Sequence, residues 1–426
     1  MKLRILHIKL SIAYYPPYWL RILATAIVFT MMCSVPSLAQ WDTTYRTPIK
    51  PVKIPFDYIN DFIVIDVKIR GFPLKFIVDT GAENTIILKK DIADLFGIEY
   101  ARRIQIMGAD MSAELYALSQ IQVPIMIEDK YRLKTNLIVL EEDFLELDGI
   151  VGLQVHGILG ASVLKNFTVE LDYRAQYMTW HQPQTYTPPS KGYDRLDLGI
   201  QRNKPYIQSL LRLNSGDSVD AKLLLDSGAS LSALLYATEK NQITIPEEYV
   251  SGSLGIGLGG SLMGYLGRVD QLMFGDYEFN QLISNFQKVE NVDSIFVEQE
   301  KDGLIGNIIL KRFDLIIDYS RNALYIKPNR NFKKKIRYDK SGLVLIKDGP
   351  YLENVKVLNV ITDSPAAEAG ILPGDRILKY RFWPISWVSY ERLLKRLSAR
   401  QGKTIKMTLE RGDERFRVQF DLRDLI

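Results

Sequence analysis

The stretch FIVDTGAENTII, residues 76–87, recurs in the chain as LLLDSGASLSAL, residues 223–234. In each copy a short apolar run leads into an aspartate, Asp79 or Asp226, which is followed by a small hydroxyl residue, a glycine and an alanine. One Asp-(Thr/Ser)-Gly sequence is typical of an ordinary turn, because Asp and Ser bond to nearby backbone and Gly adopts positive φ. A second copy with the same flanking pattern calls for a further explanation.

A second motif repeats in step with the first. An apolar-apolar-glycine element ends 81 residues after Asp79 and again 80 residues after Asp226. Both copies then continue as G-x-x-x-L-K-x-F and close on Asp-Tyr. The two copies of the element are Ile158, Leu159, Gly160 and Leu304, Ile305, Gly306. Two motifs that recur in the same order and at nearly the same spacing indicate a duplicated lobe, over residues 55–185 and 190–330.

Each lobe has the pattern of a β protein. FIVIDVKIRGFPLKFIVD, residues 62–79, alternates around a Gly-Phe-Pro turn, as paired strands do. Helical signal is brief, for example over LKKDIADLF, residues 88–96. The Pro-rich residues 181–192 predict a linker between the lobes, and the basic run 331–342 predicts a second, solvated boundary.

Residues 1–39 have the pattern of an export signal. Their basic residues precede an apolar run, ILATAIVFTMMCSVPSLA, which ends with Ser37 and Ala39 at the small-residue positions that a signal peptidase prefers. We therefore expect cleavage after Ala39 and export to the periplasm or cell envelope. The alternative is an uncleaved membrane anchor, because residues 22–39 are about long enough to cross a bilayer.

Removal of the leader balances the charge of the chain. The full sequence has 54 Lys and Arg residues against 50 Asp and Glu residues, and four of the basic residues and none of the acidic ones lie in residues 1–39. The remainder carries no net charge, so nothing indicates a nucleic-acid partner. The single cysteine, Cys33, also lies in the leader, which leaves the exported chain without a disulfide or a thiol nucleophile.

On the paired motifs, residues 55–330 resemble the aspartic proteases, in particular the retroviral-type, or retropepsin-like, branch. In that family each lobe contributes one Asp-Thr/Ser-Gly loop, the apolar-apolar-glycine element crosses behind it, and the two aspartates meet between the lobes. Retroviral enzymes assemble this site from two chains. The resemblance therefore implies two retropepsin-like β-barrel lobes that form a pseudo-dimer within one chain, which we expect to be monomeric.

The chemistry that the resemblance implies requires no metal and no other cofactor. Two carboxylates about 3 Å apart share one proton, so one acts as general base on a water while the other hydrogen-bonds the peptide carbonyl. The sequence leaves open which of Asp79 and Asp226 is protonated. Further residues would support the dyad loops: Thr80 and Ser227 by hydrogen bonds between the loops, and Gly81 and Gly228 by allowing close approach.

Ala82 and Ala229 complete the two loops. Pepsin-like enzymes often have a hydroxyl residue at this position, which donates to the carboxylate and favours its charged form. Alanine cannot donate, so we expect a dyad less acidic than that of pepsin, active from mildly acidic to near-neutral pH.

A β-hairpin flap is expected between the motifs of each lobe. The candidates are residues 105–116, with Gly108 near the tip, and residues 252–267. The second contains G-x-G-x-x-G, but a dinucleotide site would need a helix after this motif, which the further glycines disfavour. Of the three histidines, His156 is interpreted as a structural residue, and no pair has metal-ligand spacing.

Residues 341–426 resemble a PDZ domain of the kind common in exported bacterial proteases. The resemblance rests on VKVLNVITDSPAAEAGILPGDRILKY, residues 355–380, and weakens after Lys379, where YRFWPISW replaces the usual Asn-Gly turn. PDZ domains bind chain ends by strand addition, with the terminal carboxylate on backbone N–H groups. The loop that would do so contains Gly342, Leu343 and Val344. The alternative is a purely structural lid on the protease.

The sequence thus predicts a mainly β chain with a C-terminal α+β domain. The leading hypothesis is an exported aspartic endopeptidase whose PDZ domain recruits or positions polypeptide substrates or peptide C-termini. The alternative is a non-catalytic peptide-binding protein that keeps the fold. Both Asp-Gly loops are intact, which favours the enzyme. The cleavage specificity and any need to remove residues 40–55 do not follow from the sequence.

Overall fold

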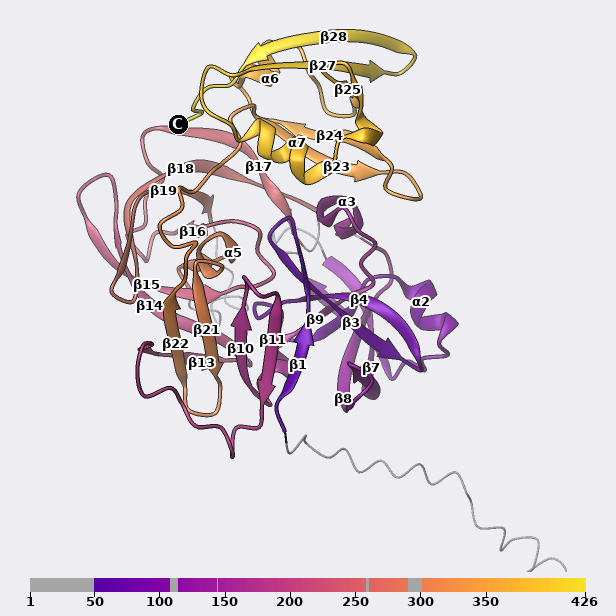
Figure 1. Ribbon diagram of the computed structural model, residues 1–426, viewed down its shortest axis with the longest axis vertical. Helices are drawn as coiled ribbons and strands as arrows, with labels where there is room; N and C mark the ends of the chain where they lie inside the picture. Colours follow the sequence, from indigo (N-terminus) through magenta and orange to yellow (C-terminus); the bar gives the residue numbers. More distant parts are fainter. Residues whose placement is uncertain (1–49, 108–113, 144, 258–259, 290–300) are drawn as a thin grey trace, which may run out of the picture. The chain divides into compact units, whose positions relative to one another are not determined.

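The computed structural model describes residues 50–107, 114–143, 145–257, 260–289 and 301–426 (Figure 1). The predicted leader and the tips of both predicted flaps lie outside these ranges. Within them the chain is mainly β, as predicted. The described residues include no helix that is long and apolar enough to cross a membrane.

Sheet 1 is built by residues 57–159. Its strands are β2 (Asp57–Ile59), β3 (Phe62–Ile69), β4 (Phe72–Val78), β5 (Thr85–Ile87), β6 (Arg102–Met107), β7 (Glu114–Ile127), β8 (Tyr131–Leu140) and β9 (Gly157–Leu159). They lie in the order β2-β3-β4-β9-β5-β8-β7-β6, and β3 also pairs with β7, so the sheet curls back on itself. Buried and exposed residues alternate along β8, as expected for a strand with one face in the core.

Sheet 2 is built by residues 199–305. Its strands are β13 (Gly199–Gln201), β14 (Lys204–Arg212), β15 (Ser218–Leu225), β16 (Ala233–Ala237), β17 (Tyr249–Gly257), β18 (Gly260–Phe274), β19 (Tyr277–Lys288) and β20 (Gly303–Ile305). Their order, β13-β14-β15-β20-β16-β19-β18-β17, matches that of sheet 1 place for place, and β14 also pairs with β18. The repeated motifs therefore lie in repeated strand arrangements.

A third sheet joins the two halves of this region and is called the shared sheet. It consists of β1 (Val52–Pro55), β11 (Tyr177–His181), β10 (Thr168–Asp172), β21 (Phe313–Asp318), β22 (Ala323–Pro328) and β12 (Asp194–Asp197), in that order (Figure 1). The central pair, β10 and β21, is antiparallel, with Glu170 opposite Ile316. These two residues lie ten positions after Gly160 and Gly306, respectively, so the register is symmetric about equivalent positions.

Helices are short in the region of the three sheets. They are α2 (Lys90–Leu95), α3 (Leu147–Val151), α4 (Ala161–Leu164) and α5 (Asn307–Leu310). One main hydrophobic core contains residues of both halves, among them Trp180 of β11 and Phe313 of β21. Trp180 is fully buried and stacks on Phe167, with ring centroids 4.6 Å apart. The two halves therefore share one core as well as one sheet.

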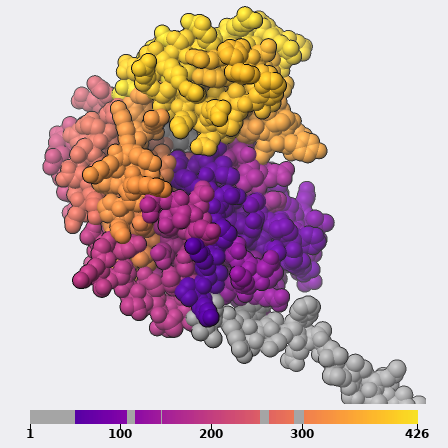
Figure 2. Space-filling view, viewed as in Figure 1, coloured from indigo at the N-terminus to yellow at the C-terminus, as the bar shows by residue number. Residues whose placement is uncertain are grey.

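The C-terminal residues form a sheet with its own core, seen in yellow as one continuous mass in Figure 2. Its elements are β23 (Leu343–Asp348), β24 (Asn354–Val360), α6 (Pro365–Glu368), β25 (Arg376–Tyr380), β26 (Trp383–Pro384), the 3₁₀ helix η1 (Ile385–Trp387), α7 (Tyr390–Leu397), β27 (Thr404–Arg411) and β28 (Glu414–Asp421). Ser364 and Ser389 cap α6 and α7, because each hydroxyl accepts a hydrogen bond from a backbone N–H three residues later.

Candidate active site

Asp79 and Asp226 occupy equivalent places at the ends of two strands. Asp79 directly follows β4, and Asp226 directly follows β15. The backbone N–H of Asp79 donates to Leu159 O, and that of Asp226 donates to Ile305 O, both at 3.0 Å. Each dyad loop is thus held by the apolar-apolar-glycine element of its own half, on the strands β9 and β20 that run parallel beside β4 and β15.

Hydrogen bonds between Thr80 and Ser227 join the two loops. Thr80 N donates to Ser227 Oγ and Ser227 N donates to Thr80 Oγ1, both at 3.0 Å. The same hydroxyls donate onward, Thr80 to Leu225 O at 2.6 Å and Ser227 to Val78 O at 2.8 Å. Both hydroxyls are buried, so the loss of either would leave backbone groups unpaired in the interior.

Each aspartate lies against the glycine of the opposite loop. A Cβ atom added at Gly81 would come within 2.7 Å of Asp226 Cγ, and one added at Gly228 within 2.3 Å of Asp79 Cγ. Any side chain at either position would collide with a dyad carboxyl group. The two glycines therefore allow the two carboxyl groups to meet, which is a steric requirement rather than one of backbone conformation.

The backbone stabilises the two carboxylates unequally. Asp79 Oδ1 accepts from Gly81 N at 2.7 Å and from Ala82 N at 2.9 Å, whereas Asp226 Oδ1 accepts from Gly228 N at 2.8 Å. Burial raises the pKa of both carboxyl groups, and their mutual repulsion opposes a second negative charge in the site. Because Asp79 accepts one more backbone N–H bond than Asp226, Asp226 is the better holder of a shared proton.

Gly160 and Gly306 allow the helices α4 and α5 to pack closely against the dyad loops. A Cβ at Gly160 would lie 2.2 Å from Asn84 O, and one at Gly306 would lie 2.4 Å from Leu231 O. The first N–H of each helix donates to an alanine of the dyad loop, at 2.8 Å to Ala82 O and at 2.9 Å to Ala229 O. The predicted supporting residues of both loops are therefore brought together in the structure.

Asn307 is a supporting residue that sequence reasoning missed. Its Nδ2 donates to Ser227 O at 2.6 Å and to Asp61 O at 2.7 Å, and its Oδ1 accepts from Tyr173 OH at 2.7 Å. It ties the second dyad loop to the first half of the chain. The sequence difference that could have indicated this role is the asparagine at the first position of α5, where the equivalent helix of the first half begins with Ala161.

His156 has a structural role in this arrangement. Its Nδ1 accepts from Lys75 N at 3.1 Å, and the equivalent bond in sheet 2 is accepted by Asp302 Oδ2 from Lys222 N at 2.8 Å. Burial lowers the pKa of His156. Across the described ranges, no group of three or more His, Cys, Asp or Glu side chains is placed to hold a metal ion.

The predicted flap segments are hairpins up to the edge of the described residues. Met107 of β6 pairs with Glu114 of β7, and Gly257 of β17 pairs with Gly260 of β18. The G-x-G-x-x-G motif thus has strands on both sides, unlike the strand–helix unit of a dinucleotide site. The tips, including Gly108, lie outside the described residues.

Gly342 directly precedes β23, and Leu343 and Val344 are the first two residues of this strand of the C-terminal sheet. Gly342 has a φ of +80° and donates its N–H to Asp339 Oδ1 at 2.7 Å. The same oxygen accepts from Ser341 N at 2.9 Å. Burial raises the pKa of Asp339 to about 6. The hydrogen bond that Gly342 N–H can donate is therefore already accepted by the Asp339 carboxylate.

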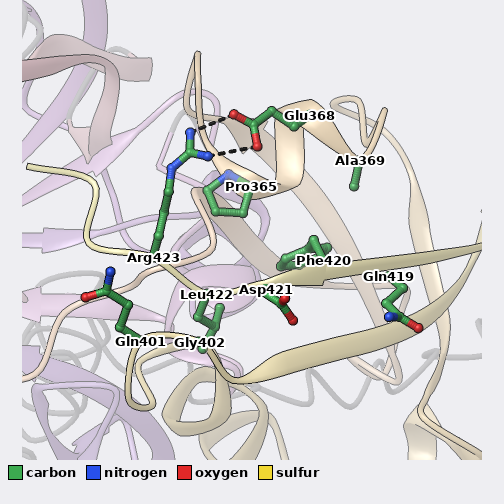
Figure 3. A pocket seen from close by; sticks show the side chains of 10 residues that line it. All are labelled: Pro365, Glu368, Ala369, Gln401, Gly402, Gln419, Phe420, Asp421, Leu422 and Arg423. Atoms are coloured by element: carbon green, nitrogen blue, oxygen red, sulfur yellow. Dashed lines mark hydrogen bonds and ion pairs between the residues drawn. The ribbon is translucent and has the colours of Figure 1, made fainter.

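A cavity of about 460 Å³ lies between α6 and the end of β28 (Figure 3). Glu368 of α6 and Arg423, two residues after β28, form an ion pair at its edge, with Nη2 and Oε1 2.7 Å apart. Both side chains are exposed to solvent, which screens the attraction between them, so the pair adds little stability. The cavity is lined by C-terminal residues alone and takes no part in the dyad.

Residues 65–166 match one family model, described as "gag-polyprotein putative aspartyl protease". This range contains Asp79 and the first apolar-apolar-glycine element, and it ends before sheet 2 and Asp226. No curated protein matches the chain. The first half of the site thus belongs to a domain of the retropepsin-like aspartyl protease type, which indicates peptidase activity.

Proposed function

We propose that the protein is an aspartic endopeptidase whose catalytic dyad is Asp79 and Asp226. One observation carries the proposal: each carboxyl group lies against the glycine of the opposite loop, while Thr80 and Ser227 bond the loops to each other. Two partly buried carboxyl groups in contact share one proton, which provides a base and an acid in one site. The family match over residues 65–166 supports the same reaction class.

In this proposal Asp79 is the ionised carboxylate and Asp226 carries the proton. Asp79 takes a proton from a water molecule as the water oxygen attacks the peptide carbonyl carbon, and Asp226 donates its proton to the carbonyl oxygen. When the tetrahedral intermediate collapses, the C–N bond breaks, Asp79 gives its proton to the leaving nitrogen, and Asp226 regains its own. We expect activity from mildly acidic to near-neutral pH; an optimum below about pH 3 would contradict this.

We further propose that residues 190–330 are the second lobe of a pseudo-dimer formed with residues 55–185. The identical strand order of sheets 1 and 2 and the symmetric register of β10 and β21 support it. Both aspartates then belong to one chain, so a monomer contains a complete site.

Cleavage of a mixed peptide library by residues 40–426 between pH 3 and 8 tests the dyad. We expect Asp79→Asn and Asp226→Asn each to reduce cleavage by at least about 10³-fold, because each removes one partner of a coupled pair. Asp66→Asn, on the exposed side of β3, is the matched control and should leave the rate unchanged. A wild-type chain that binds peptides without cleaving them would favour the non-catalytic alternative.

We also propose that residues 341–426 are a PDZ domain that positions polypeptide substrates by their C-termini. The capped α6 and the turns at Gly370 and Gly374, with φ of +76° and +95°, support this. Asp339 would have to release Gly342 N–H before a terminal carboxylate could bind there. Fluorescence anisotropy with a labelled peptide in free-acid and amidated forms tests it: the free acid should bind more tightly, and more so to Asp339→Asn. Equal binding of both forms would count against the proposal.

Residues 1–39 are proposed to direct export to the periplasm or cell envelope. N-terminal sequencing of the protein from expressing cells should find Gln40 as the first residue. A chain that still begins at Met1 in the membrane fraction would instead support the uncleaved anchor.

A further inference from the structure

Three aromatic side chains of the C-terminal sheet project into solvent beside one another. Phe382, Trp383 and Trp387 are 71%, 47% and 70% exposed. The ring centroids of Phe382 and Trp383 lie 5.1 Å apart, and those of Trp383 and Trp387 lie 5.8 Å apart. These three residues form the aromatic cluster. Single exposed apolar residues are normal on a protein surface, whereas a contiguous exposed group marks a site of interaction.

The aromatic cluster lies on a short segment whose other apolar residues hold it to the core. β25 and β26 form a tight hairpin, in which Tyr380 pairs with Trp383. Tyr380 is buried, and Ile385 and Val388 pack against the C-terminal core. The aromatic rings therefore project from a segment that is fixed in place. The segment is YRFWPISW, residues 380–387, at which the sequence departs from the PDZ pattern.

The sequence around the aromatic cluster is strongly basic. Residues 376–409 contain nine Lys and Arg residues and one acidic residue, Glu391. Residues 40–426 as a whole have equal numbers of basic and acidic residues, so this excess of positive charge is local. Of the nine, Arg376 is paired with Glu410, with Nη1 and Oε2 2.7 Å apart.

Basic residues gather where α7 ends and β27 begins. Arg396 lies in the last turn of α7, and Lys403 donates its N–H to Arg400 O at 3.3 Å in the loop that follows. Arg381, which directly precedes the aromatic cluster, donates its N–H to Lys406 O of β27 at 2.7 Å. The basic cluster consists of Arg381, Arg396, Arg400 and Lys403. Arg381 connects it to the aromatic cluster.

The members of the basic cluster are close enough to repel one another. Burial lowers the pKa of Lys403, and the charges of the three arginines lower it further. The three arginines are exposed, and no described residue forms an ion pair with any member of the cluster. Like charges that are held together in this way attract an anionic partner.

A bilayer surface with anionic lipids is the partner that fits both clusters. Trp and Phe side chains are stabilised at the boundary between headgroups and acyl chains, and Lys and Arg by the negative surface potential of anionic lipids. A soluble polyanion would pair with the basic cluster but would leave the aromatic rings in water. A peptide would need a groove, and the cavity of Figure 3 is lined by no member of either cluster.

We propose that the aromatic and basic clusters form a docking surface for a membrane that contains anionic lipids. The three rings enter the headgroup region, while the basic cluster contacts lipid phosphates. Docking of this kind is reversible, because only a few side chains enter the bilayer. It goes beyond the proposed endopeptidase function, and it requires neither the dyad nor residues 1–39.

Sedimentation with lipid vesicles tests the proposal. Residues 40–426 are used, because they contain every described helix and strand and lack the apolar run 22–39, which would itself bind lipid. The vesicles consist of phosphatidylcholine, with or without phosphatidylglycerol. We expect binding to the anionic vesicles and at least about tenfold weaker binding to the neutral ones, since several cations face the surface.

Variants of the two clusters separate their contributions. Trp387→Ser should weaken binding to the anionic vesicles at least about tenfold, because a large apolar ring is no longer buried in the bilayer. Arg396→Gln and Arg400→Gln should each weaken it about fivefold, as expected for one cation near an anionic surface. Leu95→Ser on α2 and Arg212→Gln on β14 are the matched controls, one exposed apolar and one exposed basic residue outside the C-terminal sheet. Both should bind as wild type does.

Tryptophan fluorescence provides a second readout. Bromine-labelled phosphatidylcholine in the anionic vesicles quenches only those indole rings that enter the bilayer. Emission of the wild type should be quenched, and that of Trp387→Ser should be quenched less. Thermal melting of the variant should match that of the wild type, because the Trp387 side chain is 70% exposed.

Two results with vesicles would overturn the proposal: no binding to the anionic ones, or equal binding to both compositions. Binding that needs the arginines but is neither reduced in Trp387→Ser nor quenched by bromine would overturn it too, because attraction to charge alone would then suffice. Binding to polyglutamate in place of vesicles would identify an acidic polypeptide as the partner instead. None of these results depends on cleavage, so the dyad proposal is tested separately.

Discussion

At the scale of single residues, the ionisation that the dyad carboxyl groups need for catalysis lowers the stability of the fold. Both are only partly exposed to solvent, and this desolvation raises the pKa of each above the ordinary value of 3.8. An acid whose pKa is higher in the folded state binds more protons there than in the unfolded chain. It therefore stabilises the fold at low pH and loses this contribution as the pH rises through its folded-state value.

Asp226→Asn should remove this cost in stability. Asparagine resembles the protonated carboxyl group and cannot ionise, so the variant should unfold at a higher temperature than wild type at pH 7.5. The advantage should shrink as the pH falls and vanish near pH 4, with a slope of at most about 1.4 kcal/mol per pH unit for one proton. Calorimetric melting at a series of pH values measures it. An advantage that is the same at every pH would show that the effect is unrelated to the charge.

Residues that work within one short motif could be predicted from the sequence, whereas residues that act across the fold could not. Asp79, Gly81 and their counterparts follow from the repeated motif alone. Asn307 reaches Asp61 across 246 positions of the chain. This relation leaves no local pattern of apolar or turn residues.

At the scale of elements, the fit of α4 and α5 against the dyad loops depends on two glycines. Gly160 and Gly306 have extended backbone with φ of −88° and −103°, which any residue can adopt. Their role is therefore steric, because backbone carbonyls of the loops occupy the space of a side chain. A methyl group at either place must push a dyad loop away from its helix.

Gly160→Ala and Gly306→Ala should each destabilise the protein by about 1–3 kcal/mol, as overpacking of a rigid interior does. They should also lower kcat more than they raise KM, because the loops carry the reacting groups. Gly199→Ala on β13 is the matched control, since a Cβ there meets its nearest atom at an ordinary 3.7 Å. Thermal melting and steady-state kinetics decide; equal effects of all three substitutions would contradict the steric role.

The strands were predictable from alternation, but their order in the sheets was not. The period of two is visible in the second half of β3, where exposed Asp66 and half-buried Lys68 alternate with buried residues, whereas the first four residues of β3 are buried on both faces. The insertion of β9 between β4 and β5 joins segments about 80 positions apart and has no local signature. The spacing of the repeated motifs was the one indication that the two halves would share an arrangement.

At the scale of the whole molecule, the shared sheet and the main core make the two halves one folding unit, while the C-terminal sheet has a separate core. Trp180 lies in the first half and is fully buried, whereas Trp383 and Trp387 of the C-terminal residues are 47% and 70% exposed. Tryptophan fluorescence, compared with that of Trp180→Phe, therefore reports on the shared core.

A change in the second half should thus move the unfolding of the first. Gly306→Ala should lower the urea concentration at which the Trp180 signal is lost, because both halves unfold in one cooperative transition. Leu393→Ala, in the separate C-terminal core, should leave that midpoint in place and move the signal of Trp383 and Trp387 instead. A Trp180 midpoint that ignores Gly306→Ala would show two independently folding halves.

The pairing of β10 with β21 has a consequence for the order in which the chain is made. Until the ribosome has produced residues 313–318, the edge of β10 that pairs with β21 has unpaired N–H and C=O groups. Since Glu170 faces its own counterpart, Ile316, the β10 strand of a second nascent chain offers the same register. The second half thus supplies β10 with a pairing strand from the same polypeptide. Because this strand is synthesised later than β10, there is an interval in which β10 of another chain can pair in its place.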